Sequence, residues 1–248
     1  MKVKTILVSQ PEPQTENSPY YDLAEKYKVK IDFVPFIHVQ GVSAAEVRKQ
    51  KVNVPGHTAV IMTSRNAVDH FFRIAEELRY AVPNDLKYFC TSEAIAYYLQ
   101  KYVVYRKRKI YFGNATFTDL APLLKKHKDE KFLLPTSDVL KPEIPKVLKD
   151  CKVDYTRAIM YNTVSSDLSD LADVKYDVLV FFSPSGIKSL FENFPDFKQE
   201  KTRIAAFGSS TQREVEAAGL KVNIKTPTPE LPSMTMALEA YIKKVNKR

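Results

Sequence analysis

The sequence has no tryptophan, only two cysteines, four histidines and six glycines among its 248 residues. Cys90 and Cys151 lie far apart and beside no pair of histidines, so we expect neither a disulfide framework nor a metal site, and a reducing, cytoplasmic compartment. The few glycines form no dinucleotide or Walker loop, and Gly-x-Ser-x-Gly is absent. No apolar run reaches the length of a membrane span or a secretory signal. We therefore expect no cofactor and no membrane partner.

Positive charge is in mild excess, with 38 Lys and Arg against 29 Asp and Glu and a formal net charge of +9. Such a balance favours anionic partners without naming one. The basic run Arg106–Lys109 and the C-terminal lysines are most simply solvated faces. Tyr102–Lys109 alone interleaves basic and aromatic residues, so we expect no nucleic-acid partner. The same excess of basic residues would also suit a cleft that binds a polycarboxylate substrate.

Short apolar runs alternate with amphipathic stretches, which is typical of an α/β protein with a mostly parallel sheet. The clearest helix is expected at Leu231–Val245, where apolar residues recur at helical spacing. The expected strands are Ile6–Ser9, Ile31–Gln40, Ala59–Thr63, Tyr88–Cys90, Ile110–Phe112, Phe132–Leu134, Val153–Val164, Val178–Phe182, Ile204–Phe207 and Val222–Ile224.

An internal repeat is the most informative pattern. Two strand-to-helix units recur in the same order, and so does one long extended run. The aligned pairs are Met62–Val68 with Phe181–Ile187, Phe89–Glu93 with Phe207–Thr211, and Val29–Ile37 with Val153–Tyr161. One domain would not need these units twice, so we expect two similar lobes. They are either consecutive, split near residue 128, or joined by two crossing strands with one lobe discontinuous.

Each repeated unit ends a strand in a polar turn at the start of a helix. Ser, Thr and Asn there are ordinary helix N-caps, because their oxygens accept free N–H groups of the first turn. The same N–H groups, with the helix dipole, can bind a carboxylate or phosphate. Ligands of open α/β sheets bind at the carboxyl ends of the strands. The four turns are Thr63–Asn66, Thr91–Glu93, Ser183–Gly186 and Gly208–Thr211.

In their order along the chain, these fragments and several others resemble the uroporphyrinogen-III synthase family over nearly the whole sequence. The fragments are Ile6–Gln14, Thr63-Ser-Arg-Asn-Ala-Val68, Leu134-Pro-Thr-Ser-Asp138 with Lys141 (a polar loop in the family), Tyr161-Asn-Thr163, Phe182-Ser-Pro-Ser-Gly186, Phe207-Gly-Ser-Ser-Thr211, Gly219-Leu220 and Pro227-Thr-Pro229.

The resemblance implies two flavodoxin-like lobes with parallel sheets, joined by two crossing linker strands, with a cleft between them. It favours the discontinuous arrangement: residues 1–35 plus 165–248 in lobe 1, residues 50–155 in lobe 2, and linkers at about 36–49 and 156–164. A non-catalytic two-lobed module for a small anion, which would show no turnover, is the alternative of another class.

The implied activity is cyclisation of hydroxymethylbilane to uroporphyrinogen III, with loss of water and inversion of the terminal pyrrole ring. It makes the chain a cyclising hydro-lyase of heme and other porphyrin (tetrapyrrole) biosynthesis, and we expect a monomer. Tyr161 is the expected catalytic residue. The expected substrate-binding residues are Ser64, Asn66, Ser92, Lys141, Ser183, Ser185, Gly208, Ser209, Ser210 and Thr211.

The sequence departs from the family pattern in two places. Gln10 stands where many members carry arginine, and Phe89–Glu93 stands where Gly-x-x-Thr is usual. Glu93 would repel an acidic substrate if it faced the site. We expect it to point away or to cap its helix, because a carboxylate is favourable in the first turn.

Overall fold

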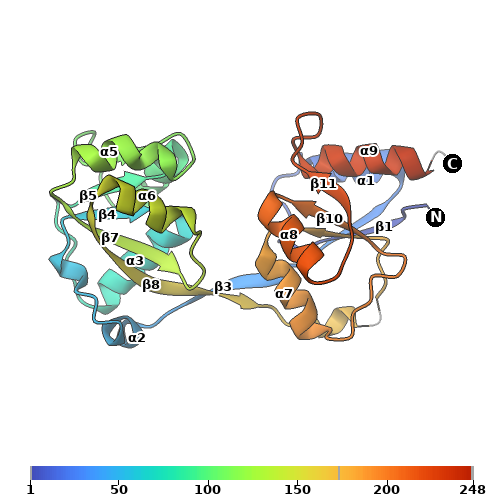
Figure 1. Ribbon diagram of the computed structural model, residues 1–248, viewed down its shortest axis with the longest axis horizontal. Helices are drawn as coiled ribbons and strands as arrows, with labels where there is room; N and C mark the ends of the chain where they lie inside the picture. Colours follow the sequence, from blue (N-terminus) through green and yellow to red (C-terminus); the bar gives the residue numbers. More distant parts are fainter. Residues whose placement is uncertain (1, 173, 247–248) are drawn as a thin grey trace. The chain divides into compact units, whose positions relative to one another are not determined.

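The computed structural model describes residues 2–172 and 174–246, and the chain divides into two compact units. Unit 1 comprises Met1–His38 and Val164–Arg248, and unit 2 comprises Val39–Thr163. The chain passes between the units along β3 (Ile37–Gly41) and β8 (Asp154–Ser165), which are neighbours in one sheet (Figure 1). Unit 2 is therefore one continuous stretch of chain, whereas unit 1 is made of two.

Unit 1 is a five-stranded parallel sheet in the order β11-β10-β9-β1-β2. In chain order this is 2-1-3-4-5, the flavodoxin-like arrangement of a doubly wound fold. Its strands are β1 (Thr5–Val8), β2 (Lys30–Phe33), β9 (Val178–Phe181), β10 (Arg203–Phe207) and β11 (Val222–Thr226).

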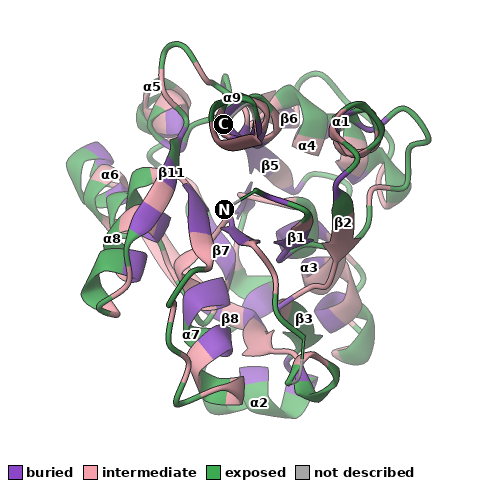
Figure 2. Ribbon diagram, turned by 90° about the vertical axis from the view of Figure 1, so that its right-hand side faces the viewer, coloured by how far each residue is buried: buried purple, intermediate pink, exposed green. Residues whose placement is uncertain are grey.

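Helices cover both faces of this sheet because its three inner strands, β1, β9 and β10, carry apolar residues on both sides. Ile6 and Val8 pack with α1 (Pro19–Tyr27) and α9 (Met234–Asn246), and Leu7 between them packs on the opposite face. That face is covered by α7 (Pro184–Asn193) and α8 (Ser209–Ala217). Burial follows the strands and the inward sides of the helices (Figure 2).

Unit 2 has a sheet in the order β3-β8-β7-β4-β5-β6, parallel from β8 to β6. Its other strands are β4 (Ala59–Met62), β5 (Lys87–Cys90), β6 (Ile110–Phe112) and β7 (Lys131–Ser137). One face packs against α2 (Ala44–Lys49), α3 (Arg65–Glu77) and α4 (Glu93–Tyr98), and the other against α5 (Ala121–Lys126) and α6 (Glu143–Cys151).

The α/β class with parallel sheets is confirmed, and three expected elements differ in detail. The run Ile31–Gln40 is two strands, because Pro35 cannot donate to a ladder and interrupts it between β2 and β3. The expected polar loop Leu134–Asp138 is largely strand, since β7 continues to Ser137. The last helix begins at Met234 rather than at Leu231, and the hydroxyl of Ser233 accepts from the N–H of Met236 there.

Short 3₁₀ turns complete the connections, at Val54–Gly56, Leu99–Lys101, Thr118–Leu120 and Ser169–Leu171. Both cysteines are buried free thiols. Within the described residues no helix is long and apolar enough to cross a membrane.

Candidate functional site

A pocket of about 540 Å³ lies in unit 2, where strands β4, β5 and β7 end and Tyr161 projects from β8. In a parallel sheet these carboxyl ends share one edge, which is the usual ligand edge of doubly wound folds. The lining is rich in hydroxyl groups and consists of Thr63, Ser64, Thr91, Ala115, Thr116, Phe117, Thr118, Thr136, Ser137, Val139, Leu140, Lys141, Glu143, Ile144 and Tyr161.

Ser64 connects the pocket to the start of α3. It has extended backbone angles, φ −161° and ψ 167°, and its Oγ accepts a hydrogen bond from the N–H of Ala67 at 3.0 Å. The same Oγ lies 3.4 Å from the Oη of Tyr161. Ser64 is thus an N-cap that also contacts the phenol on β8, so its structural and its proposed ligand roles are compatible.

Tyr161 places a buried aromatic ring at the pocket, with 7% of the residue exposed. Burial raises the pKa of its phenol above the ordinary value, and the hydrogen bond with Ser64 opposes this shift more weakly. The hydroxyl is therefore neutral and a potential proton donor over the physiological pH range. Its ring stacks on the imidazole of His70, with centroids 4.9 Å apart and 18° between the planes.

The second turn of unit 2 contributes a different residue from the one expected. Ser92 caps α4 by accepting from the N–H of Ile95, and neither it nor Glu93 lines the pocket. Thr91, one residue earlier, does line it and is buried, and its hydroxyl donates to the carbonyl of Thr63 at 3.3 Å. Glu93 is exposed in the first turn of α4. Asn66 is also exposed and outside the lining.

Arg157 on β8 fixes the end of β7 beside this pocket. Its Nε donates to the Oγ1 of Thr136 at 2.9 Å, and its Nη2 donates to the carbonyls of Ser137 and Asp138 at 2.9 and 2.8 Å. Because Thr136 accepts from the guanidinium, its own hydroxyl hydrogen remains available to the pocket. Lys141 and Glu143 put one cation and one carboxylate in the same lining.

The corresponding turns of unit 1 are at α7 and α8. Ser183 caps α7, with its Oγ accepting from the N–H of Gly186 at 3.3 Å, and Ser185 is half-buried in the first turn. A Cβ at Gly186 would lie 3.8 Å from the hydroxyl oxygens of both Ser9 and Ser183. Both hydroxyl oxygens therefore lie close to this helix start.

The start of α8 has no side-chain cap. Gly208 takes φ 83° and ψ 149°, a conformation essentially restricted to glycine, and Ser209 and Ser210 follow it exposed. Thr211 is 1% exposed, and its Oγ1 has no hydrogen-bond partner among the described residues. The first turn thus offers N–H groups and the positive end of the helix dipole to an anion.

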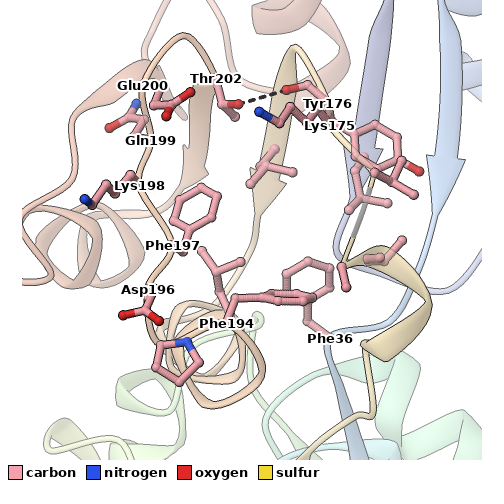
Figure 3. Close-up of a pocket in the computed structure, with 17 residues that line it drawn as sticks. Phe36, Lys175, Tyr176, Phe194, Asp196, Phe197, Lys198, Gln199, Glu200 and Thr202 are labelled. Carbon is pink, nitrogen blue, oxygen red and sulfur yellow. Dashed lines mark hydrogen bonds between the residues drawn. The ribbon is translucent and has the colours of Figure 1, made fainter.

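A larger pocket of unit 1, about 670 Å³, lies elsewhere (Figure 3). Phe36, Leu179 and Phe194 form part of its apolar lining, and the hydroxyl of Thr202 donates to the carbonyl of Tyr176 at its edge. Its polar residues belong to the segments that precede β9 and β10, so it lies away from the carboxyl ends of those strands. None of the residues expected to bind substrate lines it.

Sequence reasoning placed Ser64, Lys141 and Tyr161 among the candidates, and the fold brings all three to one pocket. It did not select the further hydroxyl residues of the lining, which are Thr63, Thr91, Thr116, Thr118, Thr136 and Ser137. Thr63, Thr91, Thr136 and Ser137 share one signal, a Thr or Ser at or just beyond the end of a strand, whereas Thr116 and Thr118 lie in the segment that follows β6. Across residues 2–172 and 174–246, no group of His, Cys, Asp and Glu side chains could hold a metal ion.

Three comparisons with known proteins give a consistent result. The family model described as uroporphyrinogen-III synthase HemD matches residues 18–236. A curated uroporphyrinogen-III synthase from Chlorobaculum parvum is 25% identical over 260 residues, covering 97% of this chain and 100% of the relative.

Two solved structures share the fold across their length. Uroporphyrinogen-III synthetase from Helicobacter pylori superposes with a TM-score of 0.62 at 17% identity, covering 97% of this chain and 99% of that one. A mutant uroporphyrinogen III synthase from the extremely thermophilic bacterium Thermus thermophilus gives 0.57 at 15% identity, covering 99% and 100%. With a family model matching most of its length, the chain belongs to the uroporphyrinogen-III synthase family of cyclising lyases in tetrapyrrole biosynthesis.

Proposed function

We propose that this chain closes linear hydroxymethylbilane to uroporphyrinogen III, with loss of water and inversion of the terminal pyrrole ring. Family membership over residues 18–236 supports the reaction. The observation that carries the proposal for this chain is the Tyr161 phenol, which lines the hydroxyl-rich pocket of unit 2 and lies 3.4 Å from Ser64.

The reaction makes modest demands on acid–base groups. The lone pair of a pyrrole nitrogen displaces the neighbouring hydroxymethyl oxygen, which takes up a proton and leaves as water, and the product is a protonated azafulvene, an azafulvenium cation. A carbon of the terminal ring then attacks the new electrophile. Attack from the substituted carbon gives a spiro intermediate. The bond from that carbon to its original methylene then breaks, the released methylene electrophile bonds to the free α-carbon of the same ring, and loss of the proton there gives the inverted isomer. The enzyme must therefore fix one conformation, and orientation alone contributes several kcal/mol to such steps, about 7 or more in well-aligned cases.

Tyr161 assists the first step as a hydrogen-bond and proton donor. Its pKa is raised by burial, so the phenol keeps its proton at neutral pH and can donate to the departing hydroxyl. Ser64 lies within reach of the phenol oxygen and can donate to it as negative charge develops there.

The acetate and propionate arms of the substrate provide handles for orientation. In unit 2 the hydroxyl groups of the pocket and Lys141 can hold carboxylates. In unit 1 the uncapped first turn of α8 suits another carboxylate. We propose that Ser64 and Lys141 of unit 2, and Ser183, Ser185, Gly208, Ser209, Ser210 and Thr211 of unit 1, supply contacts to these arms. The contacts expected from Asn66 and Ser92 are not proposed, because both residues lie outside the pocket lining.

Purified protein incubated with freshly made hydroxymethylbilane tests the proposal. The products are oxidised to porphyrins and the type I and type III isomers are separated by chromatography. We expect type III to dominate, whereas buffer and heat-denatured protein give the uninverted type I isomer. An isomer ratio equal to that of buffer would overturn the activity and leave a non-catalytic anion-binding module.

A further inference from the structure

The ring of Tyr161 is held by a second aromatic side chain, His70. The imidazole comes from the middle of α3 and lies almost parallel to the phenol ring, at 4.9 Å and 18°. The contact joins residues 91 positions apart in the sequence, on a helix and on a strand of unit 2. His70 is absent from the pocket lining, so it touches the phenol and not the volume where a ligand would lie.

Arg73 fixes the imidazole in turn. Its Nε donates to Nδ1 of His70 at 3.1 Å, and its Nη2 donates to the carbonyls of Val42 at 2.7 Å and Met160 at 3.0 Å. Its Nη1 forms a salt bridge with Glu77. Met160 immediately precedes Tyr161, so one guanidinium restrains both the ring that stacks on the phenol and the backbone that carries the phenol.

The close approach of Arg73 depends on a glycine. A Cβ at Gly41, the last residue of β3, would lie 3.0 Å from Cζ and from Nη2 of Arg73, closer than almost all real contacts of a Cβ. With hydrogen in that place, the guanidinium lies flat against the strand and reaches the two carbonyls. The arrangement therefore involves three segments of unit 2, namely β3, α3 and β8.

The hydrogen bond from Arg73 also fixes the protonation of the imidazole. Because Nδ1 accepts, the neutral ring carries its proton on Nε2. Burial lowers the pKa of His70, the nearby charge of Arg73 lowers it further, and Asp69 opposes both. The ring is therefore neutral at pH 7, in the form that Arg73 can hold.

We propose that His70 and Arg73 are positioning residues for the Tyr161 phenol, holding its ring so that the hydroxyl stays beside Ser64 at the pocket. The inference rests on the proposed function of Tyr161. Its physical basis is that catalysis by orientation is steep, since a misplacement of about 1 Å can cost about 100-fold in rate. His70 and Arg73 limit both the tilt of the phenol and the position of the strand beneath it.

A pH signature follows from this arrangement. The charged and titratable groups that face His70 are Arg73 and Asp69 on α3 and Tyr161 on β8. When His70 takes up a proton, Nδ1 becomes a donor that faces the guanidinium, so the hydrogen bond is lost and the two cations repel. The formation of type III isomer should therefore fall on the acid side, below about pH 6.5 because the pKa is lowered.

Three variants of the full-length protein test this role. In His70→Ala both the stack and the acceptor are lost, and kcat should fall about 10-fold with KM within about 2-fold. In His70→Phe the flat ring is kept and the titrating nitrogen is removed, so most of kcat should return and the acid decline of the wild type should disappear. Arg73→Gln should lower kcat and also remove the decline.

His127→Phe is the matched control. His127 also belongs to unit 2, also packs on aromatic rings, with Tyr111 at 4.6 Å, and also has a pKa lowered first by burial. It is absent from the pocket lining and has no contact with Tyr161 among the described residues. Its variant should keep both kcat and the acid decline.

The outcomes separate this inference from the proposed function. If Tyr161→Phe lowers kcat while His70→Ala retains wild-type kcat and the wild-type pH profile, the phenol acts without these two residues and the inference is overturned. The inference fails equally if His127→Phe matches His70→Ala in both readouts. If Tyr161→Phe itself leaves type III formation unchanged, the proposed role of the phenol is what fails.

Discussion

The two units share one arrangement of strands and differ in how the chain runs through it. Unit 2 reads β6-β5-β4-β7-β8 across its parallel strands, and unit 1 reads β11-β10-β9-β1-β2. The sequence repeat pairs the ends of β4 with β9, of β5 with β10, and of β8 with β2, so the spatial order is the same. The first strand of unit 1, β1, occupies the position that β7 occupies in unit 2. Burial of a sheet between two helical layers is thus compatible with either chain order.

The helix starts show where the units have diverged. The repeat aligns Ser64 with Ser183, and both cap their helices in the same way. It aligns Tyr161 with Ile37, so the phenol has no counterpart in unit 1. Gly208 lets α8 begin directly after β10, whereas unit 2 has Cys90 there and α4 begins only after Ser92. Unit 2 therefore holds the proposed proton donor, and unit 1 holds the helix terminus without a side-chain cap.

The largest expected effect belongs to the residue that unit 1 lacks. Tyr161→Phe should lower kcat about 100-fold, because the variant keeps the ring and the stack with His70 but removes the proton donor. Stability should change little, since the hydroxyl has one long hydrogen bond, 3.4 Å to Ser64. Stopped-time assays of type III formation and thermal unfolding measure the two effects. If Tyr161→Phe left kcat unchanged, the phenol would have no chemical role, and the proposed difference between the two units would fail.

Gly208→Ala tests the open terminus of unit 1. A side chain at φ 83° and ψ 149° is strained, so we expect a loss of about 1–3 kcal/mol in the free energy of unfolding and a KM raised about 10-fold. No heavy atom lies within 4 Å of the added Cβ, so the cost comes from the backbone alone.

Gly219→Ala is the control at the other end of α8. Its φ is 74°, and its Cβ would also meet nothing within 4 Å. This variant should lose comparable stability without a change in KM. A KM that rises equally in both variants would show that strain in α8, rather than its N-terminus, weakens binding.

Two capping serines of unit 2 give a smaller and sharper contrast. Ser64→Ala and Ser92→Ala each remove an N-cap, so each should cost about 1 kcal/mol in the free energy of unfolding. Only Ser64 lies beside the phenol, so only Ser64→Ala should also lower kcat. We expect a fall of roughly 5-fold, because one hydrogen bond contributes about 1 kcal/mol. Urea unfolding measures the stability of the two variants. If Ser64→Ala and Ser92→Ala lost kcat equally, the placement of the site beside Ser64 would be contradicted.

The smallest effect is expected at Glu93, the acidic residue that unit 1 replaces with Thr211. Glu93 is exposed, lies outside the pocket, and raises the pKa of the nearby Tyr97 phenol through its charge and a hydrogen bond. Glu93→Gln should leave KM within about 2-fold of wild type, because an exposed charge is screened by water and salt. A large fall in KM would show that Glu93 faces the substrate after all.

The α/β class was predictable because the strands are short apolar runs separated by helical patterns. Details that depend on how the strands pair with one another were not predictable. Pro35 could have signalled the break in Ile31–Gln40, but apolar residues on both sides of it made the run resemble one long strand. The extension of β7 to Ser137 depends on its long ladder with β8, which no local pattern encodes.

The candidate site was predictable only in part. Ser64 and Tyr161 follow from motifs, and Ser183 from the repeat. Thr91 and Ser92 are adjacent, and only the fold decides which one lies at the pocket and which one caps α4. A shift of one residue at the end of β5 would exchange these two roles. His70 gave no signal, because its partner is 91 positions away and on another element.

The split of unit 1 sets an order of events during synthesis on the ribosome. The inner strand β1 has β2 on one side and needs β9, beginning at Val178, on the other. All parallel strands of unit 2 have been made before β9 emerges. Unit 2 can therefore fold on the nascent chain while β1 and β2 still lack their partners, and unit 1 closes only when the last third of the polypeptide arrives.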